Sequence, residues 1–183
     1  VAIPAAEKML DVATGRQAIK LLDLNCCNIG HAGAKHLAAM IEKYPALETL
    51  YINFNELGDR GASFIAAALP KSKSLHELDL ARNEITGEGA KALADHLKAG
   101  TVHWIDLDGN DIDDAGARAL ANAIRNMKRI AEVGLKGNEH ITPEGERALR
   151  QAAWANTCLP KVRLGPEEVE EVEDLPCPDE EGR

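Results

Sequence analysis

Two histidines occupy matching places in the chain, each three residues before an aspartate. The pairs are His76 with Asp79 and His103 with Asp106. Two imidazoles and a carboxylate are a possible ligand set for zinc. We nevertheless expect no metal and no cofactor, because both histidines fall on an exposed edge and no third ligand completes a cage around them.

Paired carboxylates such as Asp79 and Asp106 could also raise each other's pKa, as the acids of a catalytic dyad do. Acids that recur along a regular surface are commoner than such dyads, so we interpret these as solvated side chains. The sequence has no nucleophile elbow, P-loop, HExxH motif or glycine-rich phosphate loop. We therefore predict that the protein is not an enzyme.

The elements that carry these side chains follow from one apolar spacing, L-x-x-L-x-L, which recurs at intervals of 27 to 29 residues. Its copies begin at Ile19, Leu47, Leu75, Val102, Ile130 and Leu159. Alternation with period two predicts a short strand with one apolar face. Apolar residues at helical spacing follow and predict a helix. Each such unit can bury its apolar face only by stacking on its neighbours.

Two further columns mark the turn between each strand and its helix. The first is a structural turn column of Cys27, Asn55, Asn83, Asn110 and Asn138. An asparagine amide can both donate to and accept from backbone groups that a buried turn would leave unpaired, and cysteine is a small substitute. The second column holds residue types that favour a helix N-cap: Gly30, Gly58, Thr86, Asp113 and Thr142. Pro143 then suits the first helical position.

This unit resembles the leucine-rich repeat of the ribonuclease-inhibitor-like class over roughly residues 19–164. The resemblance implies a right-handed α/β solenoid, with parallel strands on the concave side and helices on the convex side. We expect an N-terminal helical cap or truncated repeat at 1–18, five repeats at 19–158, a capping strand at 159–164 and an acidic tail at 165–183. We expect Trp154 to cover the last layer of the core.

The charge is concentrated at one end of the chain. The formal net charge is −9, and from residue 165 onward nine acids against one base contribute −8 of it. The body is therefore nearly neutral, and no basic stripe indicates nucleic-acid binding. The tail is interpreted as a solvated acidic segment, or alternatively as a clamp on the last repeat or on a basic partner.

Cysteine use and hydropathy bear on the compartment. The four cysteines include no CxxC spacing, and a domain of this size needs no disulfides, so we expect reduced thiols and an intracellular, cytoplasmic location. No apolar run is long enough to span a membrane. The chain begins at Val1, so a trimmed targeting segment stays an open alternative.

In the family, residues between the apolar strand positions project from the concave sheet, and equivalent residues stack at about 4.8 Å. We predict partner binding there, through acids and aromatic anchors that suit a basic peptide or protein surface. The predicted residues are Asp23, Tyr51, Phe54, Glu77, Asp79, Trp104, Asp106, Asp108 and Glu132. Binding through the convex helices or the ends is the alternative.

The sequence therefore predicts a non-catalytic protein–protein interaction module or scaffold. Such a module could serve as one subunit of a larger complex. The alternative is a GTPase-activating or other regulatory protein, because the Ran GTPase activator resembles this chain in repeat type and in its acidic tail. That family has about twice as many repeats, and none of its functional residues can be placed here. Actin capping, known in other relatives, normally needs a separate amphipathic segment that this sequence lacks.

Overall fold

The computed structural model describes residues 19–98, 100–158 and 160–166. Its strands are β1 (Leu21–Asp23), β2 (Thr49–Tyr51), β3 (Glu77–Asp79), β4 (Trp104–Asp106), β5 (Glu132–Gly134) and β6 (Lys161–Arg163). Its helices are α2 (Gly30–Lys43), α3 (Gly58–Ala68), α4 (Gly87–Leu97), α5 (Asp114–Asn126) and α6 (Pro143–Ala155), with a short 3-10 helix η1 (Leu69–Lys71).

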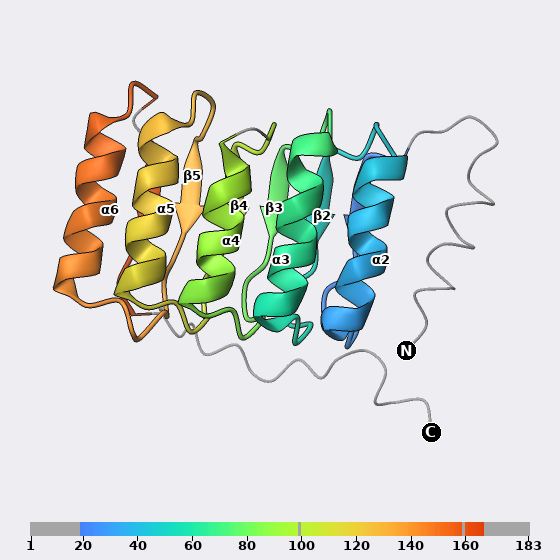
Figure 1. The fold of residues 1–183 in the computed structure, drawn as a ribbon, viewed down its shortest axis with the longest axis horizontal. Helices are drawn as coiled ribbons and strands as arrows, with labels where there is room; N and C mark the ends of the chain where they lie inside the picture. The colour runs from blue at the N-terminus through green and yellow to red at the C-terminus, as the bar shows by residue number, and fades with distance from the viewer. Residues whose placement is uncertain (1–18, 99, 159, 167–183) are drawn as a thin grey trace.

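The strands form one parallel sheet in the order β1 to β6, and the helices lie side by side as a layer on one face of it (Figure 1). Each helix packs on the next along the chain. The predicted α/β solenoid is therefore confirmed, and β6 is the strand predicted to close the sheet.

The strands pair in the register that the repeat predicts. Leu50 pairs with Leu78, Leu78 with Ile105 and Ile105 with Val133. These central residues are at most 1% exposed, whereas the residues on either side of them in β2, β3 and β4 are partly exposed. One apolar side chain per strand and the apolar stripe of each helix thus form a continuous core between the two layers.

The asparagine column joins each repeat to the one before it. The Oδ1 atom of Asn83 accepts hydrogen bonds from the backbone N–H groups of Asn55 and Leu57, at 3.1 and 3.4 Å. Its Nδ2 atom donates to the carbonyl oxygens of Ile52 and Ala81, at 2.9 and 3.0 Å. Asn55, Asn110 and Asn138 make equivalent bonds and are buried.

Cys27 departs from this column, because its side chain is exposed. Its backbone N–H donates to Oδ1 of Asn55, while its Sγ donates to the carbonyl of Asn25. The asparagines reach back to the carbonyls of the preceding repeat, and no earlier repeat lies within the described residues. Cys27 therefore has the place of the column but not its bridging role.

The helix starts confirm the predicted N-caps in three of five cases. The side chains of Thr86, Asp113 and Thr142 each accept a hydrogen bond from a backbone N–H in the first turn, and Pro143 begins α6. Gly30 and Gly58 are instead the first residues of α2 and α3, with φ of +60° and +57°. The prediction is wrong for these two because glycine has no side chain to accept a bond and supplies a left-handed turn instead.

Two predictions concern the ends of the solenoid. Trp154 does not cover the core, because it is 84% exposed. It projects from the last helix, and Leu149 and Ala152 of the same helix make the core contact instead. The predicted N-terminal cap at 1–18 and nearly all of the acidic tail lie outside the described residues.

The Asn83→Ala substitution tests the asparagine column. It removes four hydrogen bonds and leaves backbone groups in a buried turn unpaired, at about 1–3 kcal/mol for each unsatisfied group. We expect urea unfolding to show a loss of roughly 3 kcal/mol or more. Asn122→Ala, on the exposed surface of α5, should change the free energy of unfolding by less than about 0.5 kcal/mol. Equal losses in the two variants would show that the column does not bridge the repeats.

Candidate functional site

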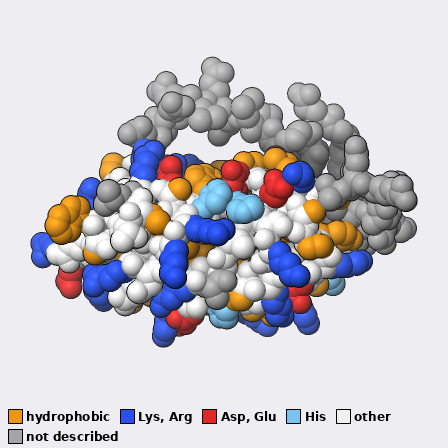
Figure 2. All heavy atoms as spheres, turned by 90° about the horizontal axis from the view of Figure 1, so that it is seen from above, with side chains coloured by type: hydrophobic (Ala, Val, Ile, Leu, Met, Phe, Trp, Pro, Cys, Tyr) orange, Lys and Arg blue, Asp and Glu red, His pale blue; other side chains and the backbone are white. Residues whose placement is uncertain are grey.

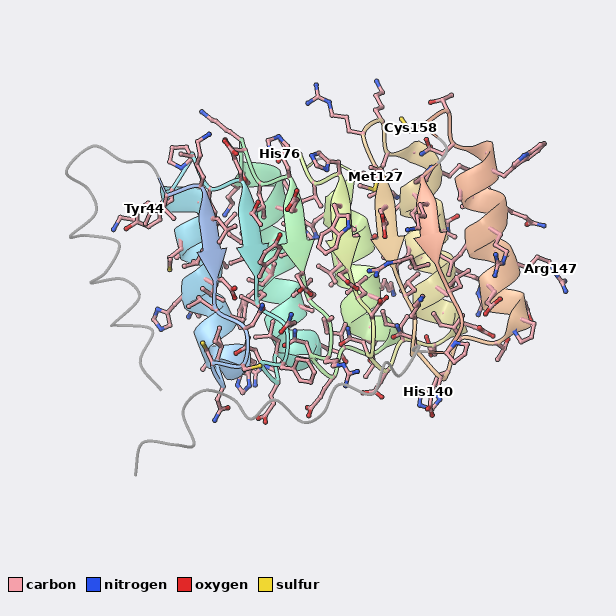
Figure 3. The ribbon with its side chains drawn as sticks, turned by 180° about the vertical axis from the view of Figure 1, so that it is seen from behind. Tyr44, His76, Met127, His140, Arg147 and Cys158 are labelled. Carbon is pink, nitrogen blue, oxygen red and sulfur yellow. The ribbon has the colours of Figure 1, made fainter. Side chains whose placement is uncertain are left out.

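We call the face of the sheet opposite the helices, which is turned toward the viewer in Figure 3, the strand face. The strand register brings most of the predicted site residues together on it. One row crosses the sheet as Asp23, Tyr51, Asp79 and Asp106, each paired with the next. A second row runs from Glu77 through Trp104 to Glu132. Asp108 follows β4 and contacts Asp106, whose Oδ1 accepts its backbone N–H at 2.9 Å.

Phe54 lies outside these rows. It follows β2 in the turn toward α3, has a left-handed φ of 53° and is 49% exposed. The guanidinium of Arg82, at the same turn position one repeat later, lies 4.8 Å from its ring centroid. The structure therefore places Phe54 at the C-terminal edge of the strands, apart from Tyr51 and Trp104.

Tyr51 is held in place by its neighbour on β3. Its hydroxyl donates to Oε2 of Glu77 at 3.2 Å, and the Thr49 hydroxyl donates to the same oxygen at 3.4 Å. Partial burial raises the pKa of the Tyr51 hydroxyl, and the bond to Glu77 and the nearby carboxylates raise it further. We call Tyr51, Glu77, Asp79 and Trp104, from β2 to β4, the tyrosine–tryptophan cluster.

The last strand supplies a cation that the sequence analysis did not consider. The Arg163 guanidinium reaches from β6 to Asp106 on β4, with Nη2 at 2.6 Å from its carboxylate. Nη1 lies 3.3 Å from Asp108, and Nε lies 3.0 Å from Glu132 without the alignment of a hydrogen bond. Three of the predicted acids thus share one cation within the chain, which offsets part of their negative charge.

Gly134 on β5 makes this reach possible. It lies in the same row, between Asp106 and Arg163. A Cβ atom at this position would overlap both the guanidinium of Arg163 and the carboxylate of Asp106. The missing side chain therefore opens the path that Arg163 takes across the sheet, and a glycine facing an arginine in the next strand was the available sequence signal.

Burial and mutual repulsion shift the titration of these acids. Burial, together with the charge of Asp106, raises the pKa of Asp108 to about 6 against the opposing effect of Arg163. Burial also raises the pKa of Asp79, which accepts hydrogen bonds from Ala81 and Asn53. Burial alone would lower the pKa of Arg163, but its bond to Asp106 and the surrounding carboxylates raise it.

The strand face is therefore divided into two halves. Asp106, Asp108 and Glu132 share Arg163, whereas among the described residues neither Glu77 nor Asp79 forms a salt bridge. Half-buried Tyr51 lies in the half whose acids have no salt bridge, and half-buried Trp104 lies at its boundary, between Glu77 and Glu132.

Comparisons with known proteins agree with this architecture. A family model described as Leucine Rich repeat matches residues 18–38, 45–66, 71–94 and 102–121. The chain belongs to the leucine-rich-repeat family. No curated protein sequence matches it.

Two solved structures share the fold of this leucine-rich-repeat protein. One is described as leiomodin-1 actin-binding site 2, with a TM-score of 0.70, 15% identity, and coverage of 85% of this chain and 90% of that one. The other is the C-terminal domain of tropomodulin from Caenorhabditis elegans, with a TM-score of 0.67, 15% identity, and coverage of 82% and 92%.

The histidine pair of this leucine-rich-repeat protein lies at the N-terminal edge of the strands, where basic side chains gather (Figure 2). The His76 and His103 rings stack with centroids 5.1 Å apart. Within the described residues, no group of three or more histidine, cysteine or acidic side chains is arranged to hold a metal. None of the described helices is long and apolar enough to cross a membrane.

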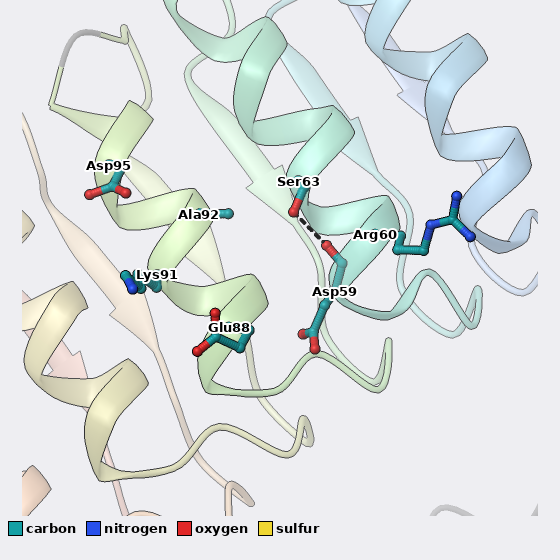
Figure 4. Close-up of a pocket in the computed structure, with 7 residues that line it drawn as sticks. All are labelled: Asp59, Arg60, Ser63, Glu88, Lys91, Ala92 and Asp95. Atoms are coloured by element: carbon teal, nitrogen blue, oxygen red, sulfur yellow. Dashed lines mark hydrogen bonds between the residues drawn. The ribbon is translucent and has the colours of Figure 1, made fainter.

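A shallow groove between α3 and α4 has a structural explanation (Figure 4). The carboxylate of Asp59 accepts hydrogen bonds from the N–H and hydroxyl of Thr86 and from the N–H of Gly89, at 2.7 to 2.9 Å. Asp114 likewise accepts hydrogen bonds from the N–H and the hydroxyl of Thr142. Each aspartate therefore caps the helix of the next repeat, a role that the sequence analysis missed.

The pKa of Asp108 predicts a pH dependence of stability. In the unfolded chain an aspartate titrates near 4, so between about pH 4 and 6 the folded state binds more protons. This contribution makes the protein more stable as the pH falls through 6. Asp108→Asn should remove this contribution. The free energy of unfolding of the variant, taken relative to wild type, should therefore rise by about 1–2 kcal/mol from pH 4 to pH 7.5, a figure reduced for the partial exposure of the carboxylate.

Urea unfolding at several pH values measures this difference, and subtraction of the two curves cancels the other titrating groups. Asparagine retains an oxygen to accept the N–H of Lys136, which lies 2.8 Å from Oδ1 of Asp108. A difference between variant and wild type that stays constant from pH 4 to 7.5 would contradict the assigned pKa.

Proposed function

We propose that this chain is a non-catalytic interaction module that binds a basic segment of a protein partner through the tyrosine–tryptophan cluster. The observation that carries the proposal is the unequal state of the two halves of the strand face. Glu77 and Asp79 present carboxylates without a salt bridge among the described residues, beside two half-buried aromatic rings.

The chain's own arginine supports the chemistry of the proposed partner. In the other half of the face, Arg163 lies across a row of acids and pairs with Asp106 and Asp108. Asp79 occupies the same row as Asp106, on the neighbouring strand. A partner's arginine or lysine that approached Asp79 would meet a carboxylate in an equivalent setting, already oriented by its bonds to Asn53 and Ala81.

The aromatic side chains would supply the apolar part of the interface. Tyrosine and tryptophan on a rigid surface are frequent anchors, because they bury a large area and lose little side-chain entropy. The bond from Tyr51 to Glu77 fixes the ring before a partner arrives, and Trp104 lies beside Glu77 in the sheet register. Six strands span about 25 Å, enough for one interface of standard size, so a role as one subunit of a complex fits.

The test compares partner capture by wild type, Tyr51→Ala/Trp104→Ala and Asp79→Asn. We expect the double variant to lose capture by at least ~30-fold. Asp79→Asn should weaken it by about tenfold, with a smaller dependence on salt because one charge pair is gone. Asp95→Asn, an exposed acid on α4, is the matched control and should bind as wild type does. Retained capture of one and the same protein by all variants would overturn the proposal.

Two further assays test the alternatives of actin binding and GTPase activation. The structural neighbour leiomodin-1 is described by its actin-binding site, so actin co-sedimentation with the same variants asks whether actin is the partner. The regulatory alternative predicts faster GTP hydrolysis by a Ran-type GTPase, which a GTPase assay with wild-type protein tests. The non-catalytic proposal predicts no acceleration.

A further inference from the structure

The last helix has one face with no partner among the described residues. Gly145, Leu149 and Ala152 of α6 are buried toward the rest of the solenoid. Arg147, Arg150, Gln151 and Trp154 are exposed, and their spacing places them on one helix face. The Arg147 side chain projects away from the end of the molecule (Figure 3). We call Arg147, Arg150 and Trp154 the end face.

The repeat register indicates that the end face does not fit the helix of another repeat of the same kind. Five residues after the helix glycine, α3, α4 and α5 carry Ala66, Ala94 and Ala121, all buried against neighbouring elements. Alanine lets adjacent helices approach to about 8–10 Å. α6 carries Arg150 at this position, and its long side chain would hold a further helix away.

A purely solubilising cap does not explain Trp154. The terminal face of a solenoid needs polar residues, and Arg147, Arg150 and Gln151 supply them. Trp154 instead leaves 84% of its accessible surface in water, although tryptophan is normally largely buried. Tryptophan and arginine are both enriched among the residues that dominate binding energy in protein interfaces.

The charges at the end face specify the partner. Arg147 forms no salt bridge among the described residues. Arg150 pairs only with Glu146, at 3.4 Å on the exposed surface, and such pairs are weak enough to exchange. Two guanidinium groups beside an indole fit carboxylates next to an apolar contact, because arginine binds carboxylates through paired, directional bonds.

We propose that the end face binds an acidic segment of a protein partner, in which a carboxylate pairs with Arg147 or Arg150 and an apolar side chain packs on Trp154. This surface is distinct from the tyrosine–tryptophan cluster and selects the opposite charge, so each proposal can fail without the other.

The experiment selects binders from a random 12-residue peptide library on the full chain and on its Trp154→Ala variant. Peptides that bind only the wild type should carry aspartate or glutamate beside an apolar residue. The chain has two tryptophans, so 5-fluorotryptophan gives two fluorine NMR signals, assigned with Trp154→Phe. The selected peptide should shift the signal of Trp154 and leave that of Trp104 in place.

Matched variants then test the charges. Trp154→Ala should weaken the selected peptide by at least ~30-fold, and Arg147→Glu or Arg150→Glu by about tenfold. Lys91→Glu is the control, because Lys91 is exposed on α4 at the position that corresponds to Arg147, and it should change affinity less than about twofold. Tyr51→Ala/Trp104→Ala should bind the peptide normally.

Three results would overturn the proposal. The first is that no selected peptide depends on Trp154. The second is that the dependent peptides lack acids or bind equally well to the arginine variants. The third is that the unliganded chain self-associates through this face, shown by a concentration-dependent mass in sedimentation that Trp154→Ala abolishes, because the occupant is then a second copy of the chain.

Discussion

The asparagine bridge between successive repeats is the interaction on which the other features depend. Each asparagine side chain accepts from the backbone of the turn before it and donates to carbonyls on both sides. An amide is suited to this because it carries two donors and an acceptor in fixed geometry. The bridge sets the offset between neighbouring turns, and the offset sets the register of the strands. Equivalent residues are therefore neighbours across the whole sheet.

The strict register of the strands places acids next to one another, and it also places Arg163 where it can pair with some of them. Identical positions in adjacent repeats hold Asp79 and Asp106 side by side, so acids repel one another across the strand face. A cation in the same row or on a partner can relieve this repulsion. The chain uses the first means in one half, where Arg163 crosses Gly134. The proposed function assigns the second means to the other half.

Much of the fold could be predicted from the sequence because its signals are local and repeated. Strand periodicity, an asparagine at a fixed place and a threonine or aspartate cap can each be recognised from the residues of a single repeat. The caps supplied by Asp59 and Asp114 were missed because each acts on the next repeat, about 27 residues away. The left-handed turns at Phe54 and Arg82 were missed because phenylalanine and arginine rarely adopt a positive φ, so neither residue type predicts one.

The positions of most site residues could be predicted from the sequence, but the ion pairs among them could not. The pairing rows of Tyr51, Asp79 and Asp106 follow from the register. The reach of Arg163 does not, because it spans two strands and depends on a missing side chain at Gly134. Trp154 was assigned to the core from its type, since large aromatic residues are usually buried. Its exposure reflects the lack of a neighbouring repeat beyond α6 within the described residues.

The most direct test of this account is a titration of the full chain with N-acetylarginine amide, followed by carbon-13 NMR of the side-chain carboxylates. The account predicts that Asp79 and Glu77 shift and saturate, whereas Asp106 and Asp108, already paired with Arg163, barely respond. Weak, non-saturating shifts are expected for other exposed acids. Equal responses of Asp79 and Asp106, or no saturation at Asp79, would contradict the division of the strand face into a half paired with Arg163 and a binding half.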